Sequence, residues 1–450
     1  MIRLLFAIWV AKIISFITTK LRIGGGSAAP GYYALKFEPN LVNKLAVQIP
    51  HNIVITGTNG KTTTARLLNH LITSQKVNTL RNSTGSNLER GIASALLSKV
   101  NVFGRINNVG IGIWELDEAA FNSVIFQLKP ELIVFLNAFR DQLDRYGEVD
   151  SVKRKWEESL RKVDWNAHLI INEGDYTIAT LEKLTDENSK LTSSFFKIRG
   201  HKMFSESESK IIDPLGVDKA DFEGRVTKSL GLKGNEVELT YPGGKINMTF
   251  DVPGVYQIYN LLAAFSVYYA LNFDLAVVAE ALKSFKPAFG RVEQIMIKGT
   301  ESLIFLIKNP TGANNVFETI YTELKEGDVI LAALNDNFAD GKDVSWIWDA
   351  EFEQLLPPLP SPLPQGARES NLNIPIVCSG LRANDMALRF KYAGFAPESI
   401  FVEEEIDEAL QLALKRKPKR LFILPTYTAL LALQNTLTSL GVKKHYWKEV

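Results

Sequence analysis

The chain has 450 residues, which predicts roughly two to four domains of about 150 residues each. Hydrophobic residues make up 46% and charged residues 22% of the chain, a globular balance that excludes a disordered or fibrous protein. The 51 basic and 50 acidic residues leave a net charge of +1, so we expect no nucleic-acid partner. Cys378 is the only cysteine, which excludes internal disulfides and cysteine-based zinc sites and fits the reducing cytoplasm.

An apolar segment lies near the start of the chain. The stretch from Leu4 to Thr18 is almost entirely apolar and is interrupted by Lys12. It is shorter than the ~20 residues that are needed to span a bilayer. Two hypotheses stay open for it. It forms a helix docked on the protein's own core, or it forms an interfacial helix near a membrane-bound substrate.

From residue 50 onward, short apolar runs alternate with helical patterns. Such runs, bounded by turns, are typical of a parallel sheet that is covered on both faces. Between about 195 and 250 the pattern becomes alternating around Pro242-Gly243-Gly244, which predicts a small antiparallel insert. The expected strands are Asn52–Thr56, Val109–Glu115, Leu132–Asn137 and His168–Asn172, then Ser194–Ile198, Val237–Tyr241 and Lys245–Phe250 in the insert; the expected helices are Thr62–Ser74, Ile258–Leu271 and Leu275–Phe285.

A second series of alternating strands and helices begins near residue 300 and predicts a separate open α/β domain. It contains the proline-rich segment Pro357–Pro364, which we interpret as an extended surface loop. The alternative is a ligand for a proline-recognition domain. The expected strands are Leu303–Lys308, Val329–Leu334, Ile374–Ser379, Ser399–Val402 and Leu421–Leu424.

The segment Thr56–Thr63 (TGTNGKTT) lies between an expected strand and an expected helix. Its glycines let the backbone approach phosphates closely, and the helix start offers free N–H groups and a positive dipole end. Lys61 would reach the terminal phosphates, and the Thr62 hydroxyl would ligate Mg²⁺. The usual loop has a further glycine where this chain has Ile55. The segment therefore predicts a nucleoside triphosphate site with a shorter loop.

Further polar residues follow the expected strands. Glu115 closes a buried strand at the edge where α/β sheets bind ligands. Because Mg²⁺ with phosphate partners needs only one or two carboxylates, we expect Glu115 to be a Mg²⁺ ligand and Glu118 to lie in a solvated turn. Asn137 ends the next strand. Arg291, within Phe289–Glu293, stands between the two α/β halves, where it could clamp a transferring phosphoryl group across a cleft.

Together these motifs resemble those of the Mur ligase family. The C-terminal half is similar, more narrowly, to the MurT subunits of lipid II isoglutaminyl synthase. The resemblance implies an α/β fold with a central P-loop domain at 46–296, a small antiparallel insert at about 195–250, and a Rossmann-like C-terminal ligase domain at 297–450, after an N-terminal segment at 1–45. The stretches that carry it are Gly25–Lys36, Thr56–Thr63, Glu115, Asn137 with Asp141–Tyr146, Tyr259-Asn260, Phe289–Glu293, Lys308–Asn314, Leu334–Asp336, Ala339–Asp349 and Leu424–Ala429.

The resemblance also implies the residues of the site. ATP and Mg²⁺ are the expected cofactors, with Thr62 and Glu115 as the Mg²⁺ ligands. Lys61, Arg291 and Asp349 are the expected catalytic residues. Several Mur ligases have a carbamylated lysine downstream of the segment that matches Asp141–Tyr146. Lys153 and Lys155 lie in about that place here, and the modification is assigned to neither of them. The expected nucleotide-binding residues are Gly57, Thr58, Asn59, Gly60, Lys61, Thr62, Thr63, Asn260, Arg291 and Asn309.

The function implied by the resemblance is the amidation of a carboxylate. ATP would phosphorylate the α-carboxylate of D-glutamate in the stem peptide of lipid II, and ammonia would attack the acyl phosphate. The ammonia would come from a separate glutaminase subunit similar to GatD, which supplies a cysteine and a histidine. Asp349 would orient that imidazole. Cys378 is no candidate nucleophile, because it lies inside an apolar strand.

Two departures from the family pattern matter. Mur ligases that act on soluble nucleotide precursors have an extra N-terminal domain, whereas about fifty residues precede the loop here, which favours a lipid-linked substrate. Many MurT-like proteins have a four-cysteine zinc ribbon, and one cysteine cannot build it, so we expect no zinc. The expected location is the cytoplasm, at the inner face of the plasma membrane if residues 1–20 touch it.

Two alternative functions remain. The first is a Mur-type ligase that adds an amino acid, as in folylpolyglutamate or cyanophycin synthesis, although Asn309 stands where such ligases usually have an aspartate. The second is a membrane-associated nucleotide-binding partner without catalysis, which the presence of Lys61 and Glu115 disfavours.

Overall fold

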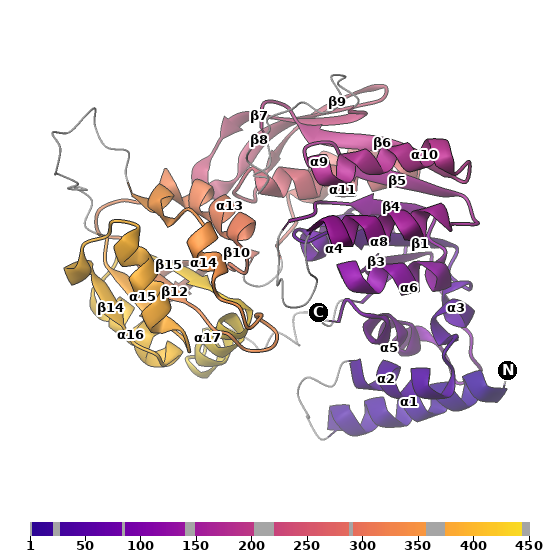
Figure 1. Cartoon of the computed structure of the whole chain (residues 1–450), viewed down its shortest axis with the longest axis horizontal. Helices are drawn as coiled ribbons and strands as arrows, with labels where there is room; N and C mark the ends of the chain where they lie inside the picture. The colour runs from indigo at the N-terminus through magenta and orange to yellow at the C-terminus, as the bar shows by residue number, and fades with distance from the viewer. Residues whose placement is uncertain are drawn as a thin grey trace.

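The computed structural model describes residues 2–20, 28–82, 86–139, 149–201, 220–287, 291–356 and 374–442, with the backbone alone of Thr19 and Arg291. It places two sheet-containing parts side by side (Figure 1). Several stretches named above lie outside the described residues, namely Gly25–Ser27, Asp141–Tyr146, Phe289-Gly290 and Pro357–Pro364.

A nine-stranded sheet forms the first part. Its strands are β1 (His51–Thr56), β2 (Thr79–Arg81), β3 (Ile111–Glu115), β4 (Leu132–Phe135), β5 (Ala167–Asn172), β6 (Leu191–Ile198), β7 (Phe222–Ser229), β8 (Asn235–Tyr241) and β9 (Gly244–Phe250). Their order is β2-β3-β1-β4-β5-β6-β7-β8-β9, parallel as far as β7 and antiparallel from β7 to β9. Ile53 and Ile55 belong to one apolar cluster and Val54 to another, so β1 is buried on both faces.

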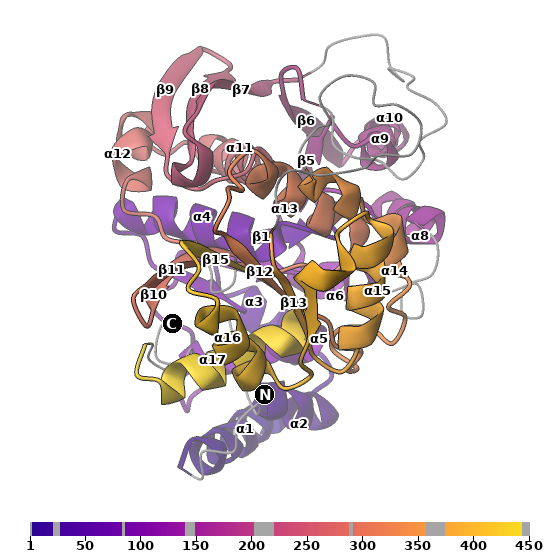
Figure 2. The same ribbon diagram turned by 90° about the vertical axis from the view of Figure 1, so that its left-hand side faces the viewer.

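Helices cover both faces of this sheet (Figure 2). Apolar side chains of α4 (Lys61–Ser74), α11 (Tyr256–Ala270) and α12 (Val278–Leu282) join the cluster that contains Ile53. Those of the opposite helices join the cluster that contains Val54. The opposite helices are α5 (Glu89–Lys99), α6 (Glu118–Leu128), α8 (Val149–Arg161), α9 (Tyr176–Ala179) and α10 (Lys183–Glu187).

The N-terminal segment folds as three helices, α1 (Ile2–Lys20), α2 (Ala29–Phe37) and α3 (Leu41–Ala46). Helix α1 packs on α2 and α5, with Ala7, Ile8 and Ala11 buried. No helix in the described part of the chain is both long and apolar enough to cross a membrane. The segment is therefore attached to the first part along one side of α1.

A six-stranded sheet forms the second part. Its strands are β10 (Arg291–Ile297), β11 (Thr300–Phe305), β12 (Val329–Ala333), β13 (Ile376–Ser379), β14 (Ile400–Val402) and β15 (Arg420–Pro425). The order is β10-β11-β15-β12-β13-β14, and each pair except β10 with β11 is parallel. The helices are α13 (Pro310–Tyr321), α14 (Trp346–Asp349), α15 (Ala383–Tyr392), α16 (Ile406–Lys415) and α17 (Tyr427–Ser439).

The predicted α/β class and the two alternating series are confirmed, with four corrections. Ser194–Ile198 lies in β6, which pairs in parallel with β5 and β7 and is not part of the antiparallel insert. Its alternating pattern arises because its side chains are only partly covered. Leu275–Phe285 is not one helix but a 3₁₀ turn followed by α12.

The other two corrections concern strands that were not predicted. β2 and β7 belong to the first sheet, and β10 belongs to the second sheet although the expected boundary at residue 296 put it in the first part. β10 is an edge strand in which only Val292 and Ile297 are buried, whereas the four residues between them are partly or fully exposed. It lacks the apolar run of a central strand, which explains why it was missed.

Candidate nucleotide-binding site

The loop between β1 and α4 presents bare backbone to the cleft between the two parts. Gly60 precedes α4 with φ of 91°, and no side chain caps this helix. A Cβ at Gly60 would lie 2.1 Å from Asn260 Oδ1, and one at Gly57 would lie 2.8 Å from Asn137 O. Both positions therefore require glycine. The uncapped N–H groups and the positive helix end form a site for an anion such as a phosphate.

The segment after β4 fixes the shape of this loop. The Asn59 N–H donates to Asn137 Oδ1 (2.7 Å), and Asn137 Nδ2 donates to Asn59 O (3.0 Å). The Phe139 N–H donates to Thr58 Oγ1 (3.0 Å). The predicted strand-end residue Asn137 is thus a brace for the loop backbone.

Two oxygen ligands meet beside the loop. Thr62 Oγ1 donates to Glu115 Oε2 over 2.7 Å, and Glu115 is only 2% exposed at the end of β3. Asn82 fixes the strand end, because its side chain bonds both the N–H and the C=O of Glu115 (2.9 Å each). A threonine hydroxyl and a carboxylate are the hard ligands that Mg²⁺ uses beside phosphates, so the pair fits that ion.

Lys61 points back into its own loop. Its Nζ donates to the carbonyl oxygens of Gly57 and of Thr58 (3.3 Å for Thr58) and lies 3.6 Å from Glu118 Oε2. Glu118 is 7% exposed, so its expected place in a solvated turn is wrong. The carboxylate is buried because it starts α6 beneath the loop and pairs with the lysine.

The second part reaches the loop through the start of α13. Asn309 Oδ1 caps this helix by accepting from the Gly312 N–H (2.8 Å). The Asn309 and Asn59 side chains also exchange two amide hydrogen bonds of 3.2 Å each, and Lys308 Nζ donates to Thr58 O (3.3 Å). Residues about 250 positions apart therefore meet at one loop. Asn309 was predicted here, whereas Lys308 was not.

A cleft of about 300 Å³ lies between the two parts. Asp340, after β12, was not predicted as a site residue. It lies in this cleft and accepts from the Thr428 N–H (2.8 Å), and burial raises the pKa of its carboxyl group. Its position at the carboxyl end of a parallel strand was the signal that could have found it. Residues that line the cleft include Thr58, Asn59, Gly60, Lys61, Thr62, Thr63, Asn260, Lys308, Asp340, Thr426 and Tyr427.

The strand that contains Arg291 enters this cleft through an irregular step. Val292 lines the cleft with φ of 68°, and the pairing of β10 with β11 shifts between Arg291 and Glu293. A left-handed conformation is rare for a β-branched residue, and a bulge redirects the neighbouring side chains. The Arg291 backbone is therefore next to the cleft, and its side chain lies outside the described atoms.

Asp349 lies on α14, away from the cleft; it is exposed and is not among the described residues that line the cleft. Arg389, which is 4% exposed, holds this short helix by donating to Ile347 O (2.8 Å) and Ala350 O (2.6 Å). The neighbouring Trp348 is 47% exposed, so it is not a core residue. Asp349 thus belongs to a separate surface.

Three other predicted features are placed as follows. Cys378 is buried in β13, and burial raises the pKa of its thiol, which agrees with its rejection as a nucleophile. Lys153 is partly buried near Asp175, whereas Lys155 is exposed. Within the described ranges no three His, Cys, Asp or Glu side chains gather as a metal site.

Two comparisons by sequence bear on this arrangement. Residues 55–268 match the Mur ligase middle domain, and residues 306–430 match the MurT ligase C-terminal domain. The chain is 30% identical over 443 residues to the lipid II isoglutaminyl synthase (glutamine-hydrolyzing) subunit MurT of Streptococcus pneumoniae, covering 93% of this chain and 94% of that one. The chain belongs to the MurT subunits of the Mur ligase family.

Solved Mur ligases share its architecture. MurF from Acinetobacter baumannii superposes with a TM-score of 0.67 at 18% identity, covering 91% of this chain and 80% of that one. The MurF ligase of Thermotoga maritima in complex with ADP gives a TM-score of 0.64 at 14% identity, covering 93% and 85%. The Mur ligase fold of this MurT chain, with a mixed central sheet and a C-terminal parallel sheet, is therefore established.

Proposed function

We propose that this chain is the ATP-dependent synthetase subunit of a lipid II isoglutaminyl synthase. It amidates the α-carboxylate of D-glutamate in the stem peptide of lipid II with ammonia that a GatD-like glutaminase releases. The observation that carries this proposal is the similarity to the MurT subunit from Streptococcus pneumoniae, which runs through nearly the full length of both chains.

The loop geometry supports ATP as the phosphoryl donor. The uncapped start of α4 would bind phosphate oxygens, and Lys61 would exchange its loop carbonyls for them. Thr62 and Glu115 would hold Mg²⁺, which offsets negative charge on the phosphates. Asn260 of α11 lines the same cleft from the first part, and Lys308 lines it from the second part, where Asn309 bonds the Asn59 side chain of the loop.

The proposed reaction joins two substitutions. A carboxylate oxygen of the substrate attacks the terminal phosphorus of ATP, and ADP leaves. The ammonia nitrogen then attacks the acyl carbon, phosphate leaves, and the nitrogen loses a proton. Lys61 and Arg291 would offset the charge that develops on the transferred group. Cys378 would not act as a nucleophile in this reaction, since it is buried in β13.

The glutaminase would dock near α14. Asp349 is exposed on this helix beside the half-exposed Trp348, whereas the nucleotide loop lies in the cleft. Glutamine hydrolysis and ATP chemistry would therefore use separate surfaces. Asp349 would orient the partner's catalytic imidazole by accepting a hydrogen bond from its N–H group.

We place the protein in the cytoplasm. The lipid-linked substrate would bring it to the inner face of the plasma membrane, with residues 1–20 as a peripheral contact.

The test replaces Asp349 by asparagine in the complex with the glutaminase. Glutamine-driven amidation of lipid II should fall on the order of 10⁴-fold, as expected for loss of a triad carboxylate, whereas amidation with ammonium chloride should be unchanged. Asp343→Asn, a nearby exposed carboxylate, is the matched control. Equal glutamine-driven rates for Asp349→Asn and Asp343→Asn would refute the assigned role of Asp349.

A further inference from the structure

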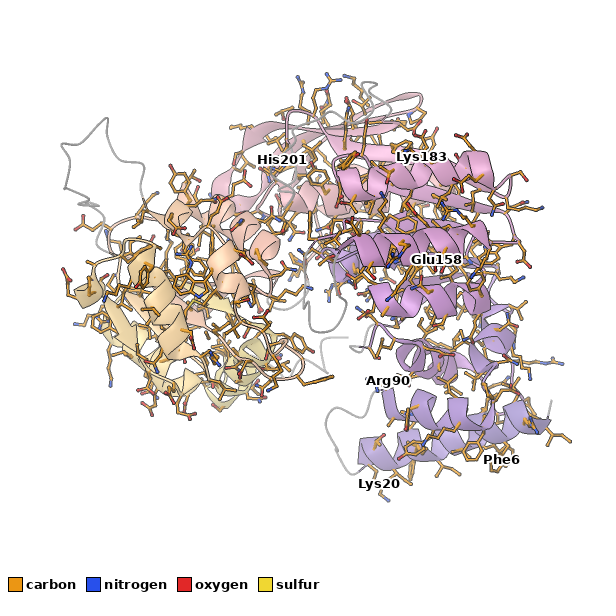
Figure 3. All side chains as sticks on the ribbon, in the orientation of Figure 1. Phe6, Lys20, Arg90, Glu158, Lys183 and His201 are labelled. Atoms are coloured by element: carbon orange, nitrogen blue, oxygen red, sulfur yellow. The ribbon has the colours of Figure 1, made fainter. Side chains whose placement is uncertain are left out.

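Helix α1 has two opposite apolar faces. One face is buried against α2 and α5 through Ala7, Ile8 and Ala11. The other carries large apolar side chains at intervals of three and four residues, which places them along one stripe of the helix. Each of them is at least 44% exposed: Ile2, Phe6, Trp9, Ile13, Phe16 and Ile17. Figure 3 shows Phe6 and Lys20 on the side of α1 that is turned away from the rest of the molecule.

The exposed stripe continues onto its neighbours. The rings of Phe6 and Phe37 of α2 meet edge to face, with centroids 5.0 Å apart. Trp9 Nε1 donates to Val102 O (3.1 Å), which brings the loop with the exposed Phe103 beside α1. We call the resulting area the N-terminal apolar surface, and it comprises Ile2, Phe6, Trp9, Ile13, Phe16, Ile17, Tyr32, Tyr33, Phe37, Val102 and Phe103. Contiguous apolar areas of this kind on soluble proteins usually mark a binding surface.

Basic residues border this surface. Lys20 Nζ lies 5.7 Å from the Phe16 ring centre, and Lys36 Nζ lies 4.6 Å from that of Tyr32. Residues 1–37 hold five of the 51 basic residues and none of the 50 acidic ones, so they carry +5 while the other 46 basic and 50 acidic residues carry −4. Positive charge in the chain is thus concentrated where the apolar side chains are exposed.

We propose that the N-terminal apolar surface binds the surface of a bilayer that contains anionic phospholipids. Helix α1 lies in the membrane plane, with its aromatic rings among the acyl chains and its lysines at the headgroups. The charge distribution favours an anionic bilayer over a second copy of the chain. Two N-terminal segments, each with a net charge of +5, would repel each other. The proposal deepens the proposed function by naming the surface from which a lipid-linked substrate is taken, and it does not depend on the nucleotide site.

Co-sedimentation of the full chain with vesicles tests this directly. We expect binding to phosphatidylcholine vesicles that contain about a third phosphatidylglycerol, and weaker, salt-independent binding to phosphatidylcholine alone. Phe6→Ser with Phe16→Ser should reduce the partition coefficient about tenfold or more. Lys20→Gln with Lys36→Gln should reduce it about fivefold per residue on the anionic vesicles and little on the neutral ones.

Matched controls separate this surface from general stickiness. Met296→Ser with Leu381→Ser removes equally exposed apolar groups in the second part, and Lys228→Gln with Lys245→Gln removes exposed charges from β7 and β9 at the other end of the first part (Figure 1). Both controls should bind like the parent. Amidation of detergent-solubilised lipid II, measured in parallel, should be unchanged in all four variants. A parent chain that does not amidate lipid II would contradict the proposed function and leave the result of the vesicle experiment unaffected. Equal vesicle binding by parent and Phe6/Phe16 variant, or a dimer that these substitutions dissociate, would overturn the proposal.

Discussion

At the scale of single residues, the nucleotide loop depends on side chains that hold its backbone. Asn137 exchanges two hydrogen bonds with the Asn59 backbone, and Asn82 does the same for Glu115. These amides fix the backbone atoms that would contact the phosphates and the Glu115 carboxylate that would hold Mg²⁺. The geometry of this phosphate site therefore depends on Asn137 and Asn82 as much as on Lys61 and Thr62.

The first prediction concerns the residues that would act on phosphate and Mg²⁺. Lys61→Ala and Glu115→Ala should each reduce ATP-dependent amidation at least about 10²-fold, because each removes a charge that acts on the phosphates. Thermal unfolding should show a folded protein in both cases. Normal turnover in either variant, with unchanged melting temperature, would remove the assignment of the nucleotide site.

Site residues could be predicted from the sequence where their role follows from the strand or helix next to them in the chain. Lys61, Thr62 and Glu115 follow buried strands or start a helix, so their place at the sheet edge could be inferred. Lys308 and Asp340 could not be assigned in this way, because their roles depend on how the second part sits against the loop. The burial of Glu118 could not be predicted, because its ion pair with Lys61 depends on the turn between β3 and α6.

At the scale of secondary-structure elements, α14 is too short to hold itself in place. It has four residues, and Arg389 of α15 donates to the carbonyl oxygens of Ile347 within it and of Ala350 just after it while pairing with Glu353 (2.8 Å). The guanidinium fork can satisfy these acceptors together, which an ammonium group cannot. Arg389 is therefore a positioning residue for Asp349.

The second prediction tests this role. Arg389→Lys should reduce glutamine-driven amidation about tenfold and leave the ammonia-driven rate unchanged, because only Asp349 is displaced. The matched control is Arg382→Lys, a partly exposed arginine that directly precedes α15 and pairs with Asp385 of that helix. A parallel loss of both rates in Arg389→Lys would show a general loss of folding and contradict the positioning role.

The third prediction concerns Asp175, which joins α9 to the segment after β4. Its carboxylate accepts from the N–H groups of Ala138 (2.8 Å) and Thr177 (2.9 Å), and burial raises its pKa to about 6. The folded-state pKa is above the unfolded value near 3.8, so the folded chain binds the proton first as pH falls. The stabilisation that this group contributes therefore increases from pH 7 towards pH 4.

Denaturation of the parent and of Asp175→Asn at pH 7 and pH 5 measures this effect. The difference in unfolding free energy between them should shift by about 1 kcal/mol in favour of the parent at pH 5. Carboxylates shared by the two proteins cancel in this comparison. A difference that is the same at both pH values would contradict the raised pKa.

The strands show which elements sequence patterns predict well. β1, β4 and β12 are buried on both faces, and their apolar runs were recognised. β6 and β10 are partly exposed, so their patterns resembled an antiparallel strand or no strand. β6 pairs in parallel with both of its neighbours, and its apolar and polar residues alternate because some of its side chains are only partly buried.

At the scale of the whole molecule, the two parts meet at the nucleotide loop. The amide pair of Asn59 and Asn309 and the bond from Lys308 to Thr58 join them across the cleft. Helix α1 had an apolar pattern that favoured neither of its two interpretations, because apolar residues lie on both of its faces. The sequence alone could not show which face is covered, since this depends on α2 and α5.

The fourth prediction is that the purified chain contains no stoichiometric zinc. Cys378 is the only cysteine and is buried in β13, so a four-cysteine ribbon cannot form in the insert. Chelators should leave the melting temperature unchanged. Elemental analysis that finds about one zinc per chain would contradict the interpretation of residues 195–250.

The most direct test of the proposed function is amidation of lipid II by the purified chain alone, with ATP, Mg²⁺ and ammonium chloride, followed by mass spectrometry of the stem peptide. We expect conversion of D-glutamate to D-isoglutamine that requires ATP and is lost in Lys61→Ala. Attachment of an amino acid instead of ammonia, or no ATP-dependent product from a folded chain, would contradict it.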